Sequence, residues 1–269
     1  MVKAVIFDMD GTLIDTEKYY RIFWPMALKH FGYEMTDEQA LSMRSLGQPY
    51  APQHLKDMFH DPDMDYDKIR AYRRKIMEEH LEKVGIELKP GAIEILTYLK
   101  EKGIHRAIST ANDIERAEKY LKKIGLYGYF DKIICAPMVE HGKPAPDVYE
   151  FACSELKLIP DECMAVEDSP NGVKSAYSAG CKVVMVPDLT QPDEELKNML
   201  LIVSASCVIP VSSFAEMGIT GCESFPSSSS ILTAGARSVL LYSTIAFLPF
   251  SISMISSSFP SILDNSTWH

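Results

Sequence analysis

The sequence predicts an α/β fold, in which a three-layer core is built on a parallel sheet and an all-helical cap is inserted near its start. Two observations predict it. Short apolar runs alternate with amphipathic helical stretches through residues 1–15 and 86–200, which is typical of a parallel sheet with right-handed crossovers. Residues 16–85 carry helical patterns and no strand pattern. We therefore expect a core of residues 1–15 and 86–200, reaching at most to residue 217, and a cap of residues 16–85.

The core elements follow one another in a regular order. Strands are expected at the apolar runs Lys3–Asp8, His105–Ser109, Lys132–Cys135, Cys163–Val166 and Lys182–Val186. Helices are expected at Ala92–Lys102, Ile114–Ile124, Asp147–Leu156, Asn171–Ala179 and Asp193–Leu200. Glycines follow three of these helices, at Gly103, Gly125 and Gly180, where a left-handed residue commonly ends a helix.

The cap is expected to contain only helices. Their amphipathic patterns cover Glu17–Phe31, Asp37–Ser45, Ala51–Phe59 and Tyr66–Lys83, and Thr36 has the character of an N-cap. Linkers near residues 15–17 and 86–90 would act as hinges, and a closing cap would exclude water from a site beneath it. The side chains expected to face that site are Tyr19, Tyr20, Arg21, Gln48, Tyr50 and His54. Packing within the cap is the alternative for the tyrosines.

Two aspartates lie close together where the first expected strand ends. Asp8 and Asp10 lie at its carboxyl end, and Gly11 then allows a sharp turn of the backbone. Two carboxylates held this closely bind a hard cation well, and Mg²⁺ prefers oxygen ligands. One carboxylate could then attack phosphorus while the other transfers protons. The alternative is a capping pair in a strand-to-helix turn.

Three further polar fragments follow apolar runs later in the chain. Thr110, Ala111 and Asn112 offer a hydroxyl, a backbone N–H and an amide. Lys143 lies on a proline-rich loop before a helix, and Glu167-Asp168 adds two carboxylates. Taken singly, these fragments are also compatible with a helix cap, a solvated charge and a turn. Together they supply what phosphoryl transfer requires: a nucleophile, a metal site, donors for phosphoryl oxygens and a cation.

These motifs resemble those of the haloacid dehalogenase superfamily, specifically the beta-phosphoglucomutase-like phosphatases with a helical cap. The resemblance covers residues 1–200 and implies a Rossmann-like catalytic core. It implies that Asp8 forms an aspartyl-phosphate and that Asp10 acts as general acid and base. It also implies that Lys143 steadies both the nucleophile and the phosphoryl group.

The same resemblance implies the remaining site residues. Thr110, the N–H of Ala111 and Asn112 would hold the phosphoryl oxygens. The cofactor would be Mg²⁺, and the implied metal ligands are Asp8, Asp10 through its backbone carbonyl, Glu167 and Asp168.

The activity implied is Mg²⁺-dependent hydrolysis of small phosphate monoesters, either sugar phosphates or nucleoside monophosphates. A sugar phosphate mutase of the beta-phosphoglucomutase type is the alternative. Three departures disfavour it: Gly11-Thr12 replaces the DGV of mutases, Tyr20 replaces their cap histidine, and no arginine matches their phosphate clamp around Gly47–Tyr50. A non-catalytic phosphate-binding protein is a weaker alternative, because the nucleophile, the acid/base and the lysine are all present.

Composition limits the partners. The 27 Lys and Arg against 37 Asp and Glu give a net charge of −10, which argues against binding to nucleic acid or an anionic membrane. The six cysteines show no CxxC spacing, and the first apolar run ends too early for a signal peptide. We therefore expect a cytoplasmic monomer whose partner is a small phosphorylated metabolite.

Residues 201–269 differ in composition from the rest of the chain. They contain 18 serines and only four charged residues, Glu216, Glu223, Arg237 and Asp264. Residues 207–217 could add a sixth strand and a short helix. For the Ser-rich, apolar tail of residues 218–269, three explanations remain: translation in a shifted frame, a disordered extension, or a membrane anchor at Ser238–Leu263.

Overall fold

The strands form one sheet in the computed structural model, which describes residues 1–203. Six parallel strands lie in the order β3-β2-β1-β4-β5-β6. They are β1 (Ala4–Phe7), β2 (His105–Thr110), β3 (Lys132–Cys135), β4 (Cys163–Glu167), β5 (Lys182–Met185) and β6 (Ile202–Val203). The α/β class is confirmed. The strand β6 was not predicted, and the predictions for residues 207–217 and 218–269 lie outside the described residues.

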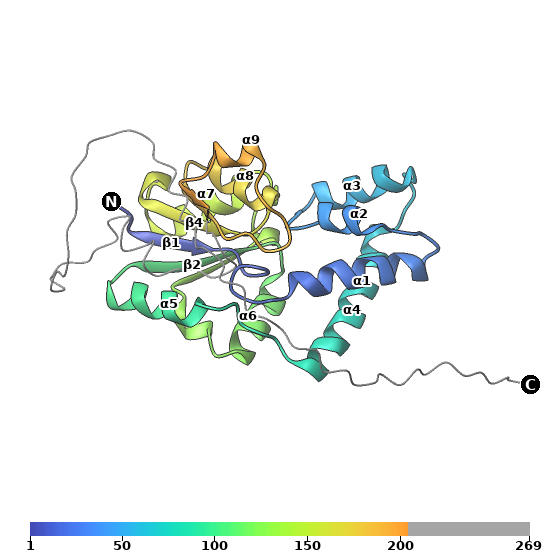
Figure 1. Cartoon of the computed structure of the whole chain (residues 1–269), viewed down its shortest axis with the longest axis horizontal. Coiled ribbons are helices and arrows are strands. Elements are labelled where there is room, and N and C mark those ends of the chain that lie inside the picture. Colours follow the sequence, from blue (N-terminus) through green and yellow to red (C-terminus); the bar gives the residue numbers. More distant parts are fainter. Residues whose placement is uncertain (204–269) are drawn as a thin grey trace, which may run out of the picture. The chain divides into compact units, whose positions relative to one another are not determined.

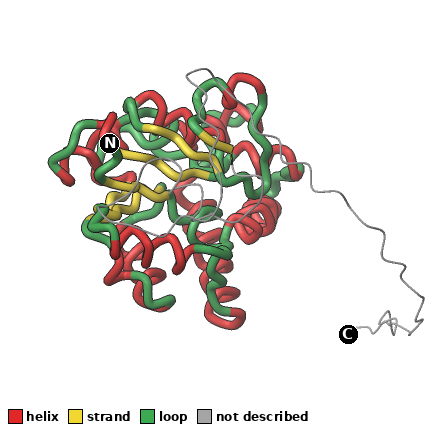
Figure 2. Tube along the Cα trace, turned by 60° about the vertical axis from the view of Figure 1, so that its left-hand side comes forward, coloured by secondary structure: helices red, strands yellow, loops and turns green. Residues whose placement is uncertain are grey.

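Helices cover both faces of the sheet. Figure 1 shows α5 and α6 on one side of the strands and α7, α8 and α9 on the other, and Figure 2 shows the strands at the centre. These helices are α5 (Ala92–Glu101), α6 (Ile114–Lys123), α7 (Asp147–Leu156), α8 (Pro170–Ser178) and α9 (Glu194–Lys197). Short 3₁₀ turns are η1 (Tyr127–Tyr129), η2 (Ala136–Met138) and η3 (Pro160–Glu162).

Alternate residues of the central strands enter two separate apolar layers. In β1, Val5 and Phe7 belong to the cluster packed against α5 and α6, whereas Ala4 and Ile6 belong to the cluster packed against α7 and α8. Because side chains alternate across a strand, a run that is apolar throughout must be buried on both faces. This burial explains why the central strands carry almost no polar residue before their carboxyl ends.

The strand register brings the polar strand ends together. Phe7 of β1 lies opposite Ile108 of β2 and Val166 of β4. The next residue, Asp8, therefore lies between the ends of these two neighbours. Open parallel sheets bind their ligands at this edge.

The final helix of the core is shorter than expected. Asp193 accepts a hydrogen bond from the Leu196 N–H and so caps α9, which ends at Lys197 instead of Leu200. The chain must leave the helix there to join the sheet, because the Leu201 N–H donates to the Val183 carbonyl, 2.8 Å away.

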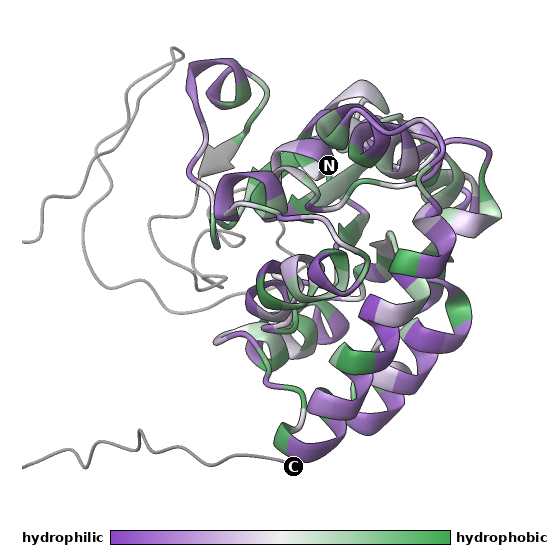
Figure 3. Ribbon diagram, turned by 90° about the vertical axis from the view of Figure 1, so that its right-hand side faces the viewer, coloured by the Kyte–Doolittle hydropathy of each residue, from purple (hydrophilic) through white to green (hydrophobic). Residues whose placement is uncertain are grey.

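Residues 16–85 are helical, as expected. They form α1 (Glu17–His30), α2 (Asp37–Ser42), α3 (Tyr50–Phe59) and α4 (Tyr66–Val84). Helices α1, α3 and α4 share their own apolar cluster, which includes Trp24, Leu28, Leu55 and Ile69. Figure 3 shows hydrophilic and hydrophobic segments alternating along the helices, as amphipathic helices require.

Local signals set the limits of α2. Thr36 and Gln39 form a capping box, with the Thr36 hydroxyl accepting from the Gln39 N–H and the Gln39 side chain accepting from the Thr36 N–H. The helix ends at Ser42 instead of Ser45, and Ser45 itself has a left-handed backbone with φ of 54°. Such a residue cannot continue a right-handed helix.

The two linkers between the helical segment and the sheet run side by side. The Asp15 N–H donates to the Glu87 carbonyl and the Lys89 N–H to the Leu13 carbonyl, each at 2.9 Å. The Lys89 ammonium also pairs with Asp15 at 3.1 Å and with Asp188 at 2.7 Å. Both connections are therefore tied together at one point.

Among the described residues, no helix is long and apolar enough to cross a membrane.

Candidate active site

Asp8 and Gly11 shape the turn that follows β1. Asp8 is buried and continues the strand, since its N–H donates to the Val166 carbonyl at 2.9 Å. Gly11 has φ of +85°, and a Cβ there would lie 2.2 Å from Oδ2 of Asp168. Only glycine satisfies both requirements. The turn therefore brings the Asp8–Gly11 segment against Asp168.

Lys143 is the buried cation of the site. Its Nζ donates to Asp8 Oδ1 at 2.5 Å, to Glu167 Oε1 at 2.6 Å and to the Ser109 carbonyl at 2.9 Å. Burial by itself lowers the pKa of Lys143, but the carboxylates of Asp8 and Glu167 outweigh it and raise the pKa overall. Lys143 therefore keeps its charge and is held against the expected nucleophile.

Three carboxylates form a cluster suited to a hard cation. Asp8, Glu167 and Asp168 each offer an oxygen, and these oxygens lie within 4.8 Å of one another. Asp8 Oδ2 and Asp168 Oδ1 are buried and have no hydrogen-bond partner among the described residues. Unpaired buried oxygens of this kind are costly unless a cation or donor reaches them. The donor set fits Mg²⁺, which takes oxygen ligands.

The pKa values of the cluster indicate that its negative charges are crowded. Burial raises the pKa of Asp8 well above its usual value, even though Lys143 lowers it. Burial likewise raises the pKa of Asp168 to about 7, against the opposing effect of Arg44. A divalent cation would relieve this crowding by favouring the ionised carboxylates.

The carboxyl group of Asp10 lies outside this cluster. Its Oδ1 accepts from the Thr16 hydroxyl at 2.5 Å, and its Oδ2 accepts from Nδ2 of Asn112 at 2.6 Å. Thr16, from the linker before α1, and Asn112, which follows β2, therefore orient the Asp10 side chain. Asn112 also donates to the Thr110 hydroxyl, from its N–H and its Nδ2, at 3.2 Å each.

A cavity of about 190 Å³ connects the core motifs with the helical segment. The core side contributes Asp8, Asp10, Thr110, Ala111 and Asn112 to its lining. The structure therefore brings these predicted residues together at one cavity. Lys143 and Glu167 are fully buried and do not line the cavity.

Two glycines form a close contact between the helical segment and the core. The Gly47 N–H donates to the Lys143 carbonyl at 2.9 Å, and the Gly142 N–H donates to the Gln48 carbonyl at 2.7 Å. A Cβ on Gly47 would lie 2.6 Å from the Cα of Gly142. The backbone before α3 is thus in direct contact with the loop that carries Lys143.

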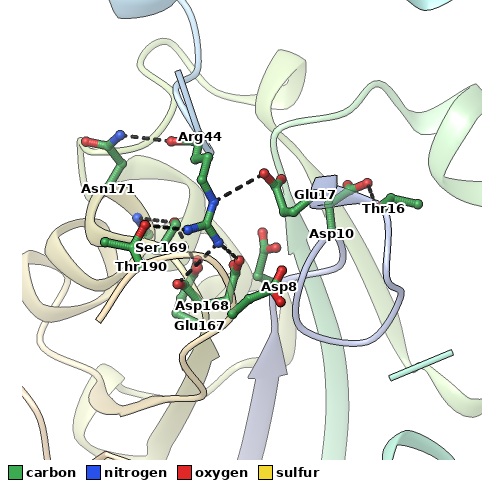
Figure 4. Close-up of polar contacts among 12 residues, drawn as sticks. Asp8, Asp10, Thr16, Glu17, Arg44, Glu167, Asp168, Ser169, Asn171 and Thr190 are labelled. Carbon is green, nitrogen blue, oxygen red and sulfur yellow. Dashed lines mark hydrogen bonds and ion pairs between the residues drawn. The ribbon is translucent and has the colours of Figure 1, made fainter. Parts of the chain in front are cut away.

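Arg44 is a site residue that sequence reasoning missed. It follows α2, is buried, and reaches the strand ends, where it pairs with Asp168 and contacts Glu17 at 3.2 Å and the Thr190 hydroxyl at 2.7 Å. Figure 4 shows its guanidinium between Glu17 and Asp168. No local motif marks this arginine. Its role depends on a contact between residues 124 positions apart.

Glu17 was missed for the same reason. Its carboxyl is buried beside Arg44 and lines the cavity. Burial raises the pKa of Glu17 to about 8, although Arg44 lowers it. The sequence shows only a glutamate in the first turn of a helix, which is a common position for acidic residues.

The expectation for the cap side chains is partly wrong. Tyr20 and Gln48 line the cavity, whereas Tyr19, Arg21, Tyr50 and His54 do not. On α1, Tyr19 packs its ring against His80 and Arg21 pairs with Asp37. Neighbouring helical residues point about 100° apart, so the three cannot share one face; the residues of α1 that line the cavity are Glu17, Tyr20 and Trp24, spaced by about one turn. Tyr50 is exposed, and the His54 ring nitrogen contacts the Ser42 hydroxyl.

Comparison with known proteins gives a consistent result. A family model described as haloacid dehalogenase-like hydrolase matches residues 5–186. The chain is 32% identical over 181 residues to the phosphorylated carbohydrates phosphatase of Thermotoga maritima, covering 66% of this chain and 82% of that protein. It is also 32% identical over 186 residues to hexitol phosphatase A of Escherichia coli, covering 68% of this chain and 82% of that protein.

A solved structure shares the fold. The beta-phosphoglucomutase of Clostridium difficile aligns with a TM-score of 0.70 and 21% identity, covering 80% of this chain and 96% of that one. At this identity the similarity shows the fold alone.

Proposed function

Since the chain belongs to the haloacid dehalogenase-like hydrolase family, we propose that it is a Mg²⁺-dependent phosphatase acting through an aspartyl-phosphate at Asp8. The family match and the relatives named as phosphatases support the hydrolysis of phosphoric monoesters. Two of those relatives are named for phosphorylated carbohydrates and for hexitols. Sugar phosphates are therefore the first substrate class to test, ahead of nucleoside monophosphates.

The pairing of Asp8 with Lys143 is the observation that carries the proposal. Lys143 Nζ holds one oxygen of Asp8 at 2.5 Å, while Oδ2 has no hydrogen-bond partner among the described residues. This second oxygen is the atom available to attack phosphorus. As the Oδ2–P bond forms, the bond from phosphorus to the ester oxygen breaks and that oxygen leaves with the electron pair.

Asp10 would transfer the protons. Thr16 and Asn112 hold its two oxygens, so its orientation is set before a substrate arrives. In its acid form it gives a proton to the leaving oxygen. The resulting carboxylate then takes a proton from the water that attacks the aspartyl-phosphate, which releases inorganic phosphate and restores both aspartates.

The other residues hold charge and orientation. The Thr110 hydroxyl and the Ala111 N–H would donate hydrogen bonds to the phosphoryl oxygens, and Lys143 would offset their charge. Asn112 would donate to them in exchange for its contact with Thr110. A bound Mg²⁺ would supply further positive charge at those oxygens. Its ligands would be Asp8, Glu167 and Asp168, together with the backbone carbonyl of Asp10.

Asp168 can serve as a ligand without losing Arg44. Arg44 contacts Oδ2 of Asp168, while Oδ1 has no partner among the described residues. We infer that Oδ1 is the metal-facing oxygen and that Arg44 holds the carboxylate in place. A fixed second oxygen of this kind orients a ligand for its metal.

Residues 16–85 would act as a cap that opens for the substrate and closes over the core of residues 1–15 and 86–200. The paired linkers and the contact of Gly47 with Gly142 support this division. We also propose that the protein acts as a monomer in the cytoplasm on small metabolites. Cys135, Cys153, Cys163 and Cys181 are free and buried, which agrees with a reducing setting.

The test is phosphate release from a panel of sugar and nucleoside monophosphates, with and without Mg²⁺. Release that requires Mg²⁺ and disappears in Asp8→Asn is the expected result. An Asp8→Asn enzyme as active as the wild type would contradict the assigned nucleophile. If folded wild-type protein releases no phosphate, hydrolysis is excluded for these substrates, and isomerisation of beta-glucose 1-phosphate tests the mutase alternative.

A further inference from the structure

Two buried arginines meet at the side chain of Met77, and one of them, Arg73, lines the cavity. Arg73 of α4 and Arg116 of α6 are each 5% exposed. Within residues 1–203 neither forms an ion pair with Asp or Glu, and the Nε of each has no hydrogen-bond partner. Both instead reach the Sδ of Met77, Arg73 at 3.6 Å and Arg116 at 3.5 Å. A thioether is a weak acceptor, so these contacts compensate little of the desolvation.

Aromatic rings hold the Arg73 guanidinium in place. It lies 4.6 Å from the ring centroid of Tyr20 and 4.9 Å from that of Trp24. Arg116 lies 5.8 Å from the same Tyr20 ring. Such contacts attract a cation, but each is weaker than a buried pairing with an anion. The two positive charges thus share one ring. Burial acts to lower the pKa of Arg116, but the neighbouring tyrosines and the carboxylates of Asp10 and Glu78 raise it overall, so Arg73 is the arginine whose charge is not compensated.

The electrostatics agree with this geometry. Burial lowers the pKa of Arg73, and the neighbouring Arg116 lowers it further. An arginine does not give up its proton in a protein, so Arg73 remains charged. Arg44, the third arginine that is buried among the described residues, contacts two carboxylates. Of the two buried arginines that line the cavity, Arg44 and Arg73, only Arg73 therefore lacks a carboxylate partner within residues 1–203.

Arg73 reaches the same cavity as the catalytic groups. It lines that cavity together with Arg70, the arginine one helical turn earlier. Tyr20 connects Arg73 with the catalytic groups. Its ring contacts Arg73, its hydroxyl donates to Asn112 Oδ1 at 3.2 Å, and Asn112 donates to Asp10 at 2.6 Å. A small ligand whose phosphoryl group lies at Asp8 would therefore extend toward the arginines.

We propose that the natural substrate is a small phosphate monoester with a second anionic group, and that Arg73, assisted by Arg70, binds this group. This proposal rests on the proposed phosphatase function and specifies its substrate class. The second group is either a carboxylate or another phosphate, since a guanidinium binds both through the same donors. Arg73 is thus a specificity-determining residue, distinct from the groups that act on phosphorus.

The experiment compares ester pairs that differ in the second anion. For the carboxylate, the pair is glucose 6-phosphate and 6-phosphogluconate; for the phosphate, it is fructose 6-phosphate and fructose 1,6-bisphosphate. In at least one pair, the wild type is expected to show a kcat/KM about tenfold or more higher for the doubly anionic ester. The pair that shows the preference identifies the second group. Equal kcat/KM values within both pairs would overturn the proposal.

The variant Arg73→Met tests the assignment. For the preferred doubly anionic ester, KM is expected to rise about tenfold or more, with kcat changing much less. Hydrolysis of p-nitrophenyl phosphate, which has no second anion, is expected to stay within about twofold of wild type. A loss of the same size on both esters would show a structural role and overturn the proposal.

Controls separate folding and the proposed function from the inference. Arg21→Met removes the same charge from an exposed arginine of the cap and should leave the substrate preference intact. Arg73→Lys keeps the charge and should restore part of the preference if Arg73→Met folds poorly. Calorimetry on Asp8→Asn measures ester binding without turnover. If no ester is hydrolysed but the doubly anionic ester binds more tightly, the phosphatase function fails and the anion site stands; equal binding overturns the site.

Discussion

At the scale of single residues, Lys143 balances the charge of the site. It is the only cation in direct contact with both Asp8 and Glu167 within the described residues, and all three side chains are buried. Removing one partner of a buried pair leaves an uncompensated charge, which is more costly than the pair itself is stabilising. Two carboxylates would lose their partner at once.

The substitution Lys143→Met should therefore reduce both stability and activity. We expect a loss of about 3–5 kcal/mol in the free energy of unfolding and of about 10²–10³-fold or more in kcat. Urea unfolding and phosphate release measure the two effects. Lys174→Met, which removes a surface lysine paired with Glu195, is the control and should change neither. Unchanged kcat in Lys143→Met would contradict the role given to Lys143.

Gly172 gives a second test at this scale, because it leaves room for a carboxylate. A Cβ on Gly172 would lie 2.0 Å from the Glu167 carboxyl group, which is fully buried and cannot move aside easily. Gly172→Ala should displace Glu167 and weaken Mg²⁺ binding by about 10–100-fold, as measured by calorimetry. Gly128→Ala is the matched control, since a Cβ there would meet no atom within 4 Å. Equal Mg²⁺ affinity in the two variants would argue against Glu167 as a ligand.

At the scale of elements, α4 and α6 connect the helical segment to the core. Asp113 caps α6 by accepting from the Arg116 N–H at 3.0 Å, and it also pairs with Arg74 of α4. Tyr120 of α6 donates to Glu78 of α4 at 2.9 Å. These contacts join the helical segment to the core, so they would have to break or shift if the proposed cap opens.

The pairing of Asp113 should make stability depend on pH. Burial acts to raise the pKa of Asp113, but the Arg116 N–H and Arg74 outweigh it and lower the pKa overall. A carboxyl whose pKa is lowered on folding stabilises the protein fully above its ordinary pKa, and this contribution disappears as the pH falls through the lowered value. Asp113→Asn should thus cost about 0.5–1 kcal/mol at pH 7, and its difference from wild type should shrink below about pH 4.

Urea unfolding between pH 3 and pH 7 measures this difference. Glu115→Gln removes an exposed carboxylate from the same helical turn and serves as the control, with a much smaller expected effect. A difference between Asp113→Asn and wild type that grows toward low pH would have the wrong sign and refute the explanation.

At the scale of the whole molecule, all proposed site residues lie within residues 1–203. Residues 218–269 are rich in serine and apolar residues and contain only three charged residues, Glu223, Arg237 and Asp264. Charged surface keeps proteins soluble, whereas exposed apolar segments favour association. The tail is therefore expected to reduce solubility without contributing to the chemistry.

Truncation after Met217 should leave Mg²⁺-dependent phosphate release within about twofold of the full chain and raise the soluble yield. The measurements are specific activity and the concentration reached before aggregation. A truncated chain that fails to fold would show that the tail contributes to the structure, and it would contradict the frame-shift explanation.

Local sequence signals were sufficient to predict most of the helices and strands of the core. The helix at residues 147–156 and the strand at residues 132–135 have the expected limits, because apolar periodicity and capping residues act over a few positions. Asp8, Thr110 and Glu167 could likewise be located at strand ends, and a parallel sheet brings such ends to one edge.

The sequence by itself therefore determined the sheet, the helical insertion and the core side of the cavity. Tertiary structure decided which cap residues reach that cavity. Tyr20 but not Tyr19 faces it because of the rotation of α1, and Arg44 and Arg73 reach it through contacts with residues distant in the chain. No pattern of neighbouring residues encodes how one helix is placed against a distant loop, since that placement depends on the packing of the whole fold. The groups proposed to select the substrate were for this reason visible only in the structure.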